Sequence, residues 1–155
     1  RVKAHIRKTY EAIYAVAARA EAGMKFSDLY AFAMDHFGGV SHVIGWMTTH
    51  HDPLKVNLGH TIPGSLEKDS PKGNSFEEVK EFIRSRRIYI NRDEQFSIPE
   101  TCAFTVEARL VDRTQPELPN VLFHFIVTFS DGEKHILTNF GEIFRTAGMD
   151  YLQGA

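Results

Sequence analysis

Two strand-like stretches decide the fold: TCAFTVEARLV at residues 101–111 and VLFHFIVTFSDGEKHILT at residues 121–138. Both are rich in β-branched and aromatic residues, which favour strands. The second contains Ser130-Asp131-Gly132-Glu133, a turn of the Asp-Gly kind that is typical of a tight hairpin. The pattern therefore predicts strands over residues 101–111, 121–129 and 134–138, connected as an antiparallel meander.

Helical patterns lie on both sides of this meander. Apolar residues recur at three- and four-residue steps over residues 6–20 and 29–37, and glycines follow both segments. Ser27 is the predicted N-cap of the second helix, and Ser75 with Glu78 predicts a capping box for a third.

Two weaker elements complete the order. Residues 87–91 alternate polar and apolar side chains like an edge strand, and residues 140–147 predict a closing helix that Gly148 ends. Helices followed by a run of strands indicate an α+β fold.

Composition restricts the class of protein. The 155 residues are 43% hydrophobic and 25% charged, which fits one globular domain over residues 1–155. The net charge of -2 gives no field that attracts nucleic acid or an anionic membrane. No run is long enough for a membrane helix and no secretory signal opens the chain, so a cytoplasmic location is expected. The single cysteine, Cys102, is expected to be a small buried hydrophobe. Because helical periodicity starts at Arg1, we expect a fragment of a longer polypeptide.

Candidate functional residues are histidines and one carboxylate. His42, His50, His51 and His60 lie close together in a stretch rich in glycine and proline, and Glu107 lies in an otherwise apolar strand. An imidazole and a carboxylate that face one cleft can bind a metal or act as an acid and base pair.

These segments resemble the pita-bread metallopeptidases, the family of methionine aminopeptidase, aminopeptidase P and prolidase. Gly39-Val40-Ser41-His42-Val43-Ile44-Gly45 resembles the segment with their histidine ligand, and His50-His51-Asp52-Pro53 is similar to their second histidine. Ile98-Pro99-Glu100, leading into Phe104-Thr105-Val106-Glu107, resembles the segment with a glutamate ligand. The final hairpin is similar to the one that ends those catalytic domains.

The resemblance implies the C-terminal half of a pita-bread fold, with helices on one face of a curved antiparallel sheet. It implies a metal-dependent aminopeptidase or Xaa-Pro dipeptidase that acts on peptides with two divalent ions, Mn, Co or Zn. His42 and Glu107 would be metal ligands, and His50 or His51 would steady the substrate or intermediate. His60, which follows Gly59, offers an alternative register for the histidine ligand.

Two departures leave the enzymatic activity open. The family's aspartate pair would lie before the first helix, outside this chain, and the place of its last glutamate falls near Phe123 or His124. A neutral imidazole at His124 can bind a metal but brings no negative charge. The alternative is a metal-free pseudo-peptidase that binds peptides or protein partners, and a homodimer that covers the half-fold surface is a third reading.

Ordinary structural roles also remain open for the candidate residues. Glu107 can pair with Arg109, and His42 can be a hydrogen-bonded strand residue. His50 and His51 can be loop residues, and His124 can belong to an aromatic core.

Overall fold

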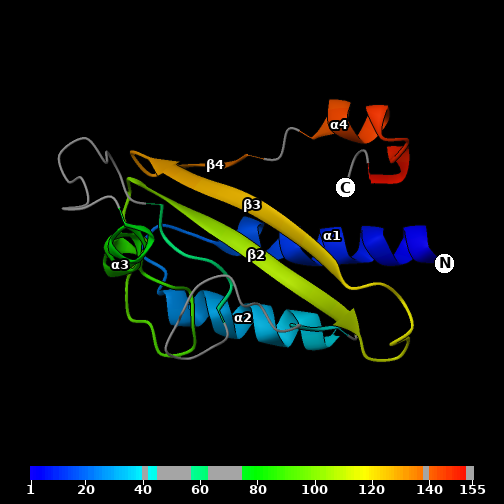
Figure 1. Cartoon of the computed structure of the whole chain (residues 1–155), viewed down its shortest axis with the longest axis horizontal. Coiled ribbons are helices and arrows are strands. Elements are labelled where there is room, and N and C mark those ends of the chain that lie inside the picture. Colours follow the sequence, from blue (N-terminus) through cyan, green and yellow to red (C-terminus); the bar gives the residue numbers. More distant parts are fainter. Residues whose placement is uncertain (40–41, 45–56, 63–74, 138–139, 153–155) are drawn as a thin grey trace.

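The computed structural model describes residues 1–39, 42–44, 57–62, 75–137 and 140–152, with the backbone alone at residues 42–44, 80 and 83–85 (Figure 1). The elements in chain order are α1 (Val2–Arg19), α2 (Phe26–Gly39), β1 (His42–Ile44), α3 (Phe76–Arg86), β2 (Cys102–Asp112), β3 (Val121–Ser130), β4 (Glu133–Leu137), α4 (Gly141–Thr146) and the 3-10 helix η2 (Asp150–Leu152). Within the described part of the chain, no helix is both long and apolar enough to cross a membrane.

The predicted antiparallel meander is confirmed. The strands form one open sheet in the order β1-β2-β3-β4, and every neighbouring pair is antiparallel. Asp131 and Gly132 connect β3 to β4 with positive φ angles of 50° and 82°. A two-residue hairpin with both central residues in this region matches the right-handed twist of the strands, which explains the Asp-Gly pair.

The core lies between this sheet and the first two helices. In Figure 1, α1 crosses behind β2 and β3, and α2 lies beside it. Alternate residues of β2 face these helices and are fully buried, namely Phe104, Val106, Ala108 and Leu110. The helices contribute the apolar stripes that the 3.6-residue periodicity predicts, since the buried residues of α1 include Tyr10, Ala12, Ile13, Val16 and Ala17.

The prediction of Ser27 as the N-cap of the second helix is wrong by two residues. Helix α2 begins at Phe26, so Ser27 lies inside its first turn. The amides of Phe26 and Ser27 instead donate to the carbonyls of Phe96 and Glu94. A distant backbone segment thus satisfies the first donors of the helix, and no side-chain cap is needed there.

The expected edge strand at residues 87–91 is only partly formed. It appears as short antiparallel pairing with residues 57–62, marked by a bridge between His60 and Tyr89. Residues 57–62 pair on their other side with β2 through a bridge between Thr61 and Phe104. The segment around His60 therefore lies in the middle of three extended chains.

The predicted capping box of α3 is confirmed, and it has a consequence for pH. The Ser75 hydroxyl and amide both donate to Glu78 Oε2, at 2.6 and 3.2 Å. Because these bonds favour the ionised carboxylate, they lower the pKa of Glu78. The stabilisation by the cap is therefore fully present above the ordinary pKa of a glutamate. It is lost as the pH falls through the lowered pKa that Glu78 has in the folded protein.

We expect Ser75→Ala to return the pKa of Glu78 to its usual range, because both the hydroxyl donor and the ordered cap are removed. The measurement is an NMR titration of the Glu78 side-chain carboxyl carbon. Ser75→Thr is the matched control, since it keeps the hydroxyl and should keep the pKa low. An unchanged pKa of Glu78 in Ser75→Ala would contradict the capping box.

Candidate functional site

Glu107 lies in the middle of β2, on the face of the sheet that points away from α1 and α2. Its neighbours Val106 and Ala108 are fully buried against the helices, and alternation along a strand therefore places Glu107 on the opposite face. Its side chain is only 14% exposed. Across the sheet, Glu107 pairs with His124 of β3, whose side chain is exposed. A carboxylate and an imidazole are thus neighbours on the face of the sheet opposite α1 and α2.

A second imidazole, that of His60, lies beside Glu107. It comes from residues 57–62, which pair with β2 along the edge opposite β3. The Thr105 amide donates to the His60 carbonyl at 2.8 Å, and the His60 amide donates to Thr105 Oγ1 at 3.0 Å. The ring of His60 stands edge-on to that of Tyr89, with centroids 6.0 Å apart. These contacts fix His60 beside the carboxylate: Nε2 lies 3.9 Å from Glu107 Oε1, and the His60 side chain is 12% exposed.

Gly59 is the residue that permits this approach. Its φ is +141°, and a Cβ at this position would lie 2.1 Å from the Thr105 carbonyl oxygen. No side chain can occupy that space, because the obstacle is backbone. The presence of glycine just before His60 therefore has a steric cause.

The hydrogen bonds of His60 define which ring nitrogen is available. Nδ1 lies 3.0 Å from the Thr61 carbonyl oxygen, which can only accept, so Nδ1 carries the proton. In the neutral ring, Nε2 is then the nitrogen without a proton, and it lies on the side of Glu107. The 3.9 Å between Nε2 and Oε1 is too long for a hydrogen bond. It is also longer than the roughly 3.3–3.6 Å between two ligands of one tetrahedral ion, each about 2.0–2.2 Å from the metal, so binding a shared ion requires the two side chains to move closer together.

The described residues supply a pair of ligands here and not a complete metal centre. Across those parts of the chain, no group of three or more His, Cys, Asp or Glu side chains has the arrangement of a metal site. A site with one metal or two therefore needs further donors.

The other candidate residues are placed as follows. The backbone of His42 pairs with Asp112, which is five residues beyond Glu107, or about 16 Å along the strand. His50 and His51 lie outside the described residues. Of the two registers for the histidine ligand, the alternative one, His60, lies beside Glu107. The signal in the sequence was the glycine before His60, although nothing local shows that Gly59 faces Thr105.

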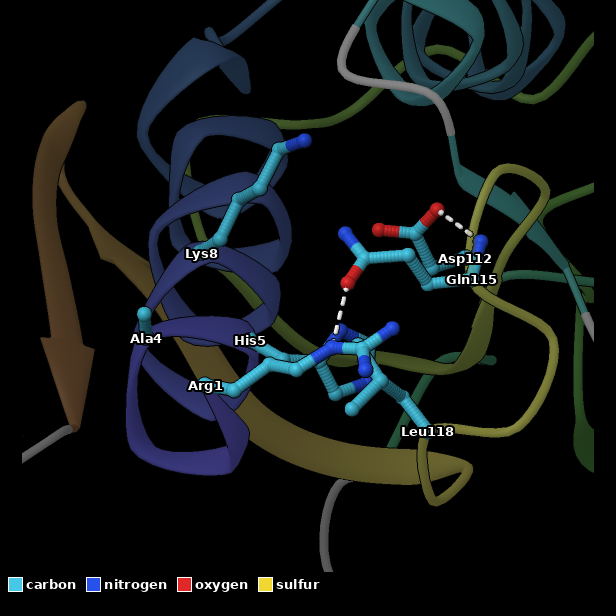
Figure 2. A pocket seen from close by; sticks show the side chains of 7 residues that line it. All are labelled: Arg1, Ala4, His5, Lys8, Asp112, Gln115 and Leu118. Carbon is cyan, nitrogen blue, oxygen red and sulfur yellow. Dashed lines mark hydrogen bonds between the residues drawn. The ribbon is translucent and has the colours of Figure 1, made fainter.

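A pocket of about 190 Å³, lined mostly by polar residues, lies between the start of α1 and the loop after β2 (Figure 2). Sequence reasoning did not single out its two buried residues, His5 and Asp112. Asp112 Oδ1 accepts from the amides of Thr114 and Gln115 at 2.8 and 3.1 Å. His5 Nε2 lies 2.9 Å from the Pro119 carbonyl oxygen and donates to it. These groups hold the loop against α1, which is a structural role.

Cys102 is half-buried, and its Sγ lies 3.7 Å from the Pro99 carbonyl oxygen. Burial raises the pKa of the Cys102 thiol. A raised pKa keeps the thiol protonated near neutral pH, which disfavours a nucleophilic role.

Comparison with known proteins gives a match at the level of the fold. The chain is similar to the crystal structure of an X-Pro aminopeptidase from Thermotoga maritima MSB8, with a TM-score of 0.51 and 18% sequence identity. The match covers 87% of this chain and 30% of that one. No protein-family model matches the sequence. No curated protein matches it either. The chain thus has the α+β fold of the C-terminal half of a pita-bread aminopeptidase, with helices on one face of an open antiparallel sheet.

Proposed function

We propose that this chain is part of a metal-dependent aminopeptidase-like domain, in which Glu107 and His60 hold one divalent ion at a peptide-binding face. The observation that carries the proposal is the pair of potential ligand atoms, Nε2 of His60 and Oε1 of Glu107, 3.9 Å apart on the face of the sheet opposite α1 and α2. The fold likeness to an X-Pro aminopeptidase supports it. An imidazole nitrogen with a carboxylate oxygen suits Mn, Co or Zn.

The chain's own residues have separable tasks in this proposal. Glu107 supplies negative charge, and the bond from Nδ1 to the Thr61 carbonyl orients the imidazole of His60 and leaves Nε2 as the proton-free nitrogen of the neutral ring. The Tyr89 ring restricts rotation of the imidazole. A bound ion would supply Lewis-acid polarisation of a peptide carbonyl. Hydrolysis further requires carboxylate donors beyond the pair that the described residues provide.

We expect Glu107→Gln to weaken binding of Mn²⁺, Co²⁺ or Zn²⁺ by about 100-fold or more, because it removes a ligand and its charge. The measurement is titration calorimetry with each metal. His60→Gln should act in the same direction.

Glu100→Gln is the matched control, since Glu100 is an exposed glutamate just before β2. It should leave metal affinity unchanged. Equal metal affinity in the wild type, Glu107→Gln and His60→Gln would contradict the proposed ligand pair.

A second candidate function is a metal-free peptide-binding module of the same fold. One observation favours this function: the residue opposite Glu107 on β3 is His124, which is not a carboxylate. Peptide affinity distinguishes the two candidates: the metal-free module should bind Ala-Pro-Ala equally well with and without a chelator, whereas the metal-dependent domain should lose affinity when the metal is removed.

A further inference from the structure

The pocket of about 190 Å³ between the start of α1 and the loop after β2 contains two hydrogen-bond donors that the fold does not use (Figure 2). One is the ammonium of Lys8, in the second turn of α1, and the other is the side-chain amide nitrogen of Gln115, in the loop. Within the part of the chain that the structure describes, neither Lys8 Nζ nor Gln115 Nε2 has a hydrogen-bond or ion-pair partner. Two such donors in one pocket are suited to a ligand that accepts hydrogen bonds.

The side-chain amide of Gln115 is held in one orientation. Its Oε1 accepts from Arg1 Nε at 2.8 Å, so Nε2 is turned away from Arg1. The backbone amide of the same residue donates to Asp112 Oδ1 at 3.1 Å, which anchors the loop. Figure 2 shows the Gln115 amide extending from the loop toward α1 and Lys8 reaching from α1 toward the loop. Because Gln115 is already ordered, its Nε2 loses little freedom when a ligand binds.

The charges that line the pocket favour an anion with a single negative charge. Lys8 supplies one positive charge, and its side chain is half-buried. The guanidinium of Arg1 also lines the pocket, but it is paired with Glu117. Asp112, which is 5% exposed, places a carboxylate in the same lining. Since this carboxylate repels negative charge, a monoanion is favoured over a dianion such as phosphate.

The size of the pocket and its apolar residues restrict the ligand further. A volume of about 190 Å³ corresponds to roughly six water molecules, so an anion of about four to six non-hydrogen atoms fits. Ala4 and Leu118 line the pocket and offer an apolar surface to methyl or methylene groups. A carboxylate has two oxygens, which can accept from an ammonium and from an amide at the same time. Short-chain monocarboxylic acids combine these properties.

We propose that this pocket binds a small monocarboxylate, with the size range of acetate to butyrate. Its two oxygens accept hydrogen bonds from Lys8 Nζ and Gln115 Nε2, and its alkyl group contacts Ala4 and Leu118. The site is separate from the proposed metal ligands, because Asp112 is five residues beyond Glu107, or about 16 Å along β2. Binding here is therefore independent of the proposed peptidase-like function.

An NMR titration of the ¹⁵N-labelled whole chain with sodium propionate tests the proposal. Propionate should shift the side-chain amide resonances of Gln115, and the shift should saturate. Propionamide has the same shape without the charge, so propionate should bind at least about 10-fold more tightly.

Two variants change the two donors separately. Lys8→Met keeps the length of the side chain and removes the ammonium, so it should weaken binding of propionate by about 10- to 100-fold. Gln115→Glu keeps an acceptor for Arg1 and replaces the donor with a negatively charged oxygen, so it should abolish binding. Lys3→Met is the matched control, since Lys3 is an exposed lysine of the same helix that does not line the pocket. Its affinity for propionate should equal that of the wild type.

The other outcomes overturn the proposal. Propionate that leaves the Gln115 side-chain resonances unchanged, or that binds Lys8→Met as tightly as the wild type, would show that these donors form no site. Equal affinity for propionamide would rule out recognition of a carboxylate. Tighter binding of phosphate would contradict the choice of a monoanion. N-acetyl-glycyl-alanine carries the same carboxylate at the end of a peptide, and tighter binding of this compound than of propionate would replace the free acid with a chain terminus.

A melting temperature measured without ligand guards against a structural role for Lys8. Because Lys8 Nζ has no partner among the described residues, Lys8→Met should melt within about 2 °C of the wild type. A larger fall would show that the ammonium stabilises the fold through a partner within the protein, and would overturn the assignment of Lys8 to a ligand.

Discussion

Replacing Gly59 with alanine is expected to destabilise the protein by roughly 3–5 kcal/mol. Two costs add at this position. The φ of +141° is a conformation that L side chains rarely adopt, and the new Cβ would lie 2.1 Å from the Thr105 carbonyl oxygen. To relieve the clash, residues 57–62 must move away from β2, which breaks the hydrogen bond from the Thr105 amide to the His60 carbonyl. Urea denaturation should show a lower midpoint with an unchanged slope.

Gly23→Ala is the matched control for this prediction. Gly23 also has a positive φ, +85°, but a Cβ added there would meet no atom within 4 Å. Its replacement should cost only about 1 kcal/mol, from backbone strain alone. If Gly59→Ala were no worse than Gly23→Ala, the close approach of Gly59 to Thr105 would be refuted. Gly59→Ala should also weaken metal binding, because His60 moves with residue 59.

Replacing Phe104 with alanine is expected to cost about 3–5 kcal/mol, the usual range for a large aromatic residue in a packed core. Phe104 is fully buried. Its ring meets that of Phe26 from α2 at a centroid distance of 5.3 Å and that of Phe129 from β3 at 6.3 Å. The side chain thus joins a helix to two strands, and its loss leaves a cavity that none of these elements can easily fill. The measurement is again the denaturation midpoint.

Two further variants provide a comparison for the loss of stability expected in Phe104→Ala. Phe104→Leu keeps most of the volume and should cost about 1.5 kcal/mol or less. Phe76→Ala removes a ring that is 77% exposed, so stability should change by less than about 0.5 kcal/mol. A small effect of Phe104→Ala would mean that β2, the strand with Glu107, is not anchored to the helices through this ring.

The parts of the fold that depend on local physics could be read from the sequence. The Asp131-Gly132 turn follows from the two positive φ angles that such a hairpin needs, and the pair of strands it joins follows from their apolar, β-branched content. The Ser75 and Glu78 capping box was equally local, since both partners lie within one helical turn. Glu107 stood out as a carboxylate inside an apolar strand.

Only the tertiary structure decided what surrounds Glu107. The sequence favoured His42 over His60 by motif order, yet pairing between segments 45 residues apart is what brings Thr105 and His60 together. The start of α2 at Phe26 likewise depends on the carbonyls of Phe96 and Glu94. The physical reason is common to both cases: spacing along the chain fixes the turn, the cap and the alternation of a strand, whereas the register between distant segments fixes which side chains share a site.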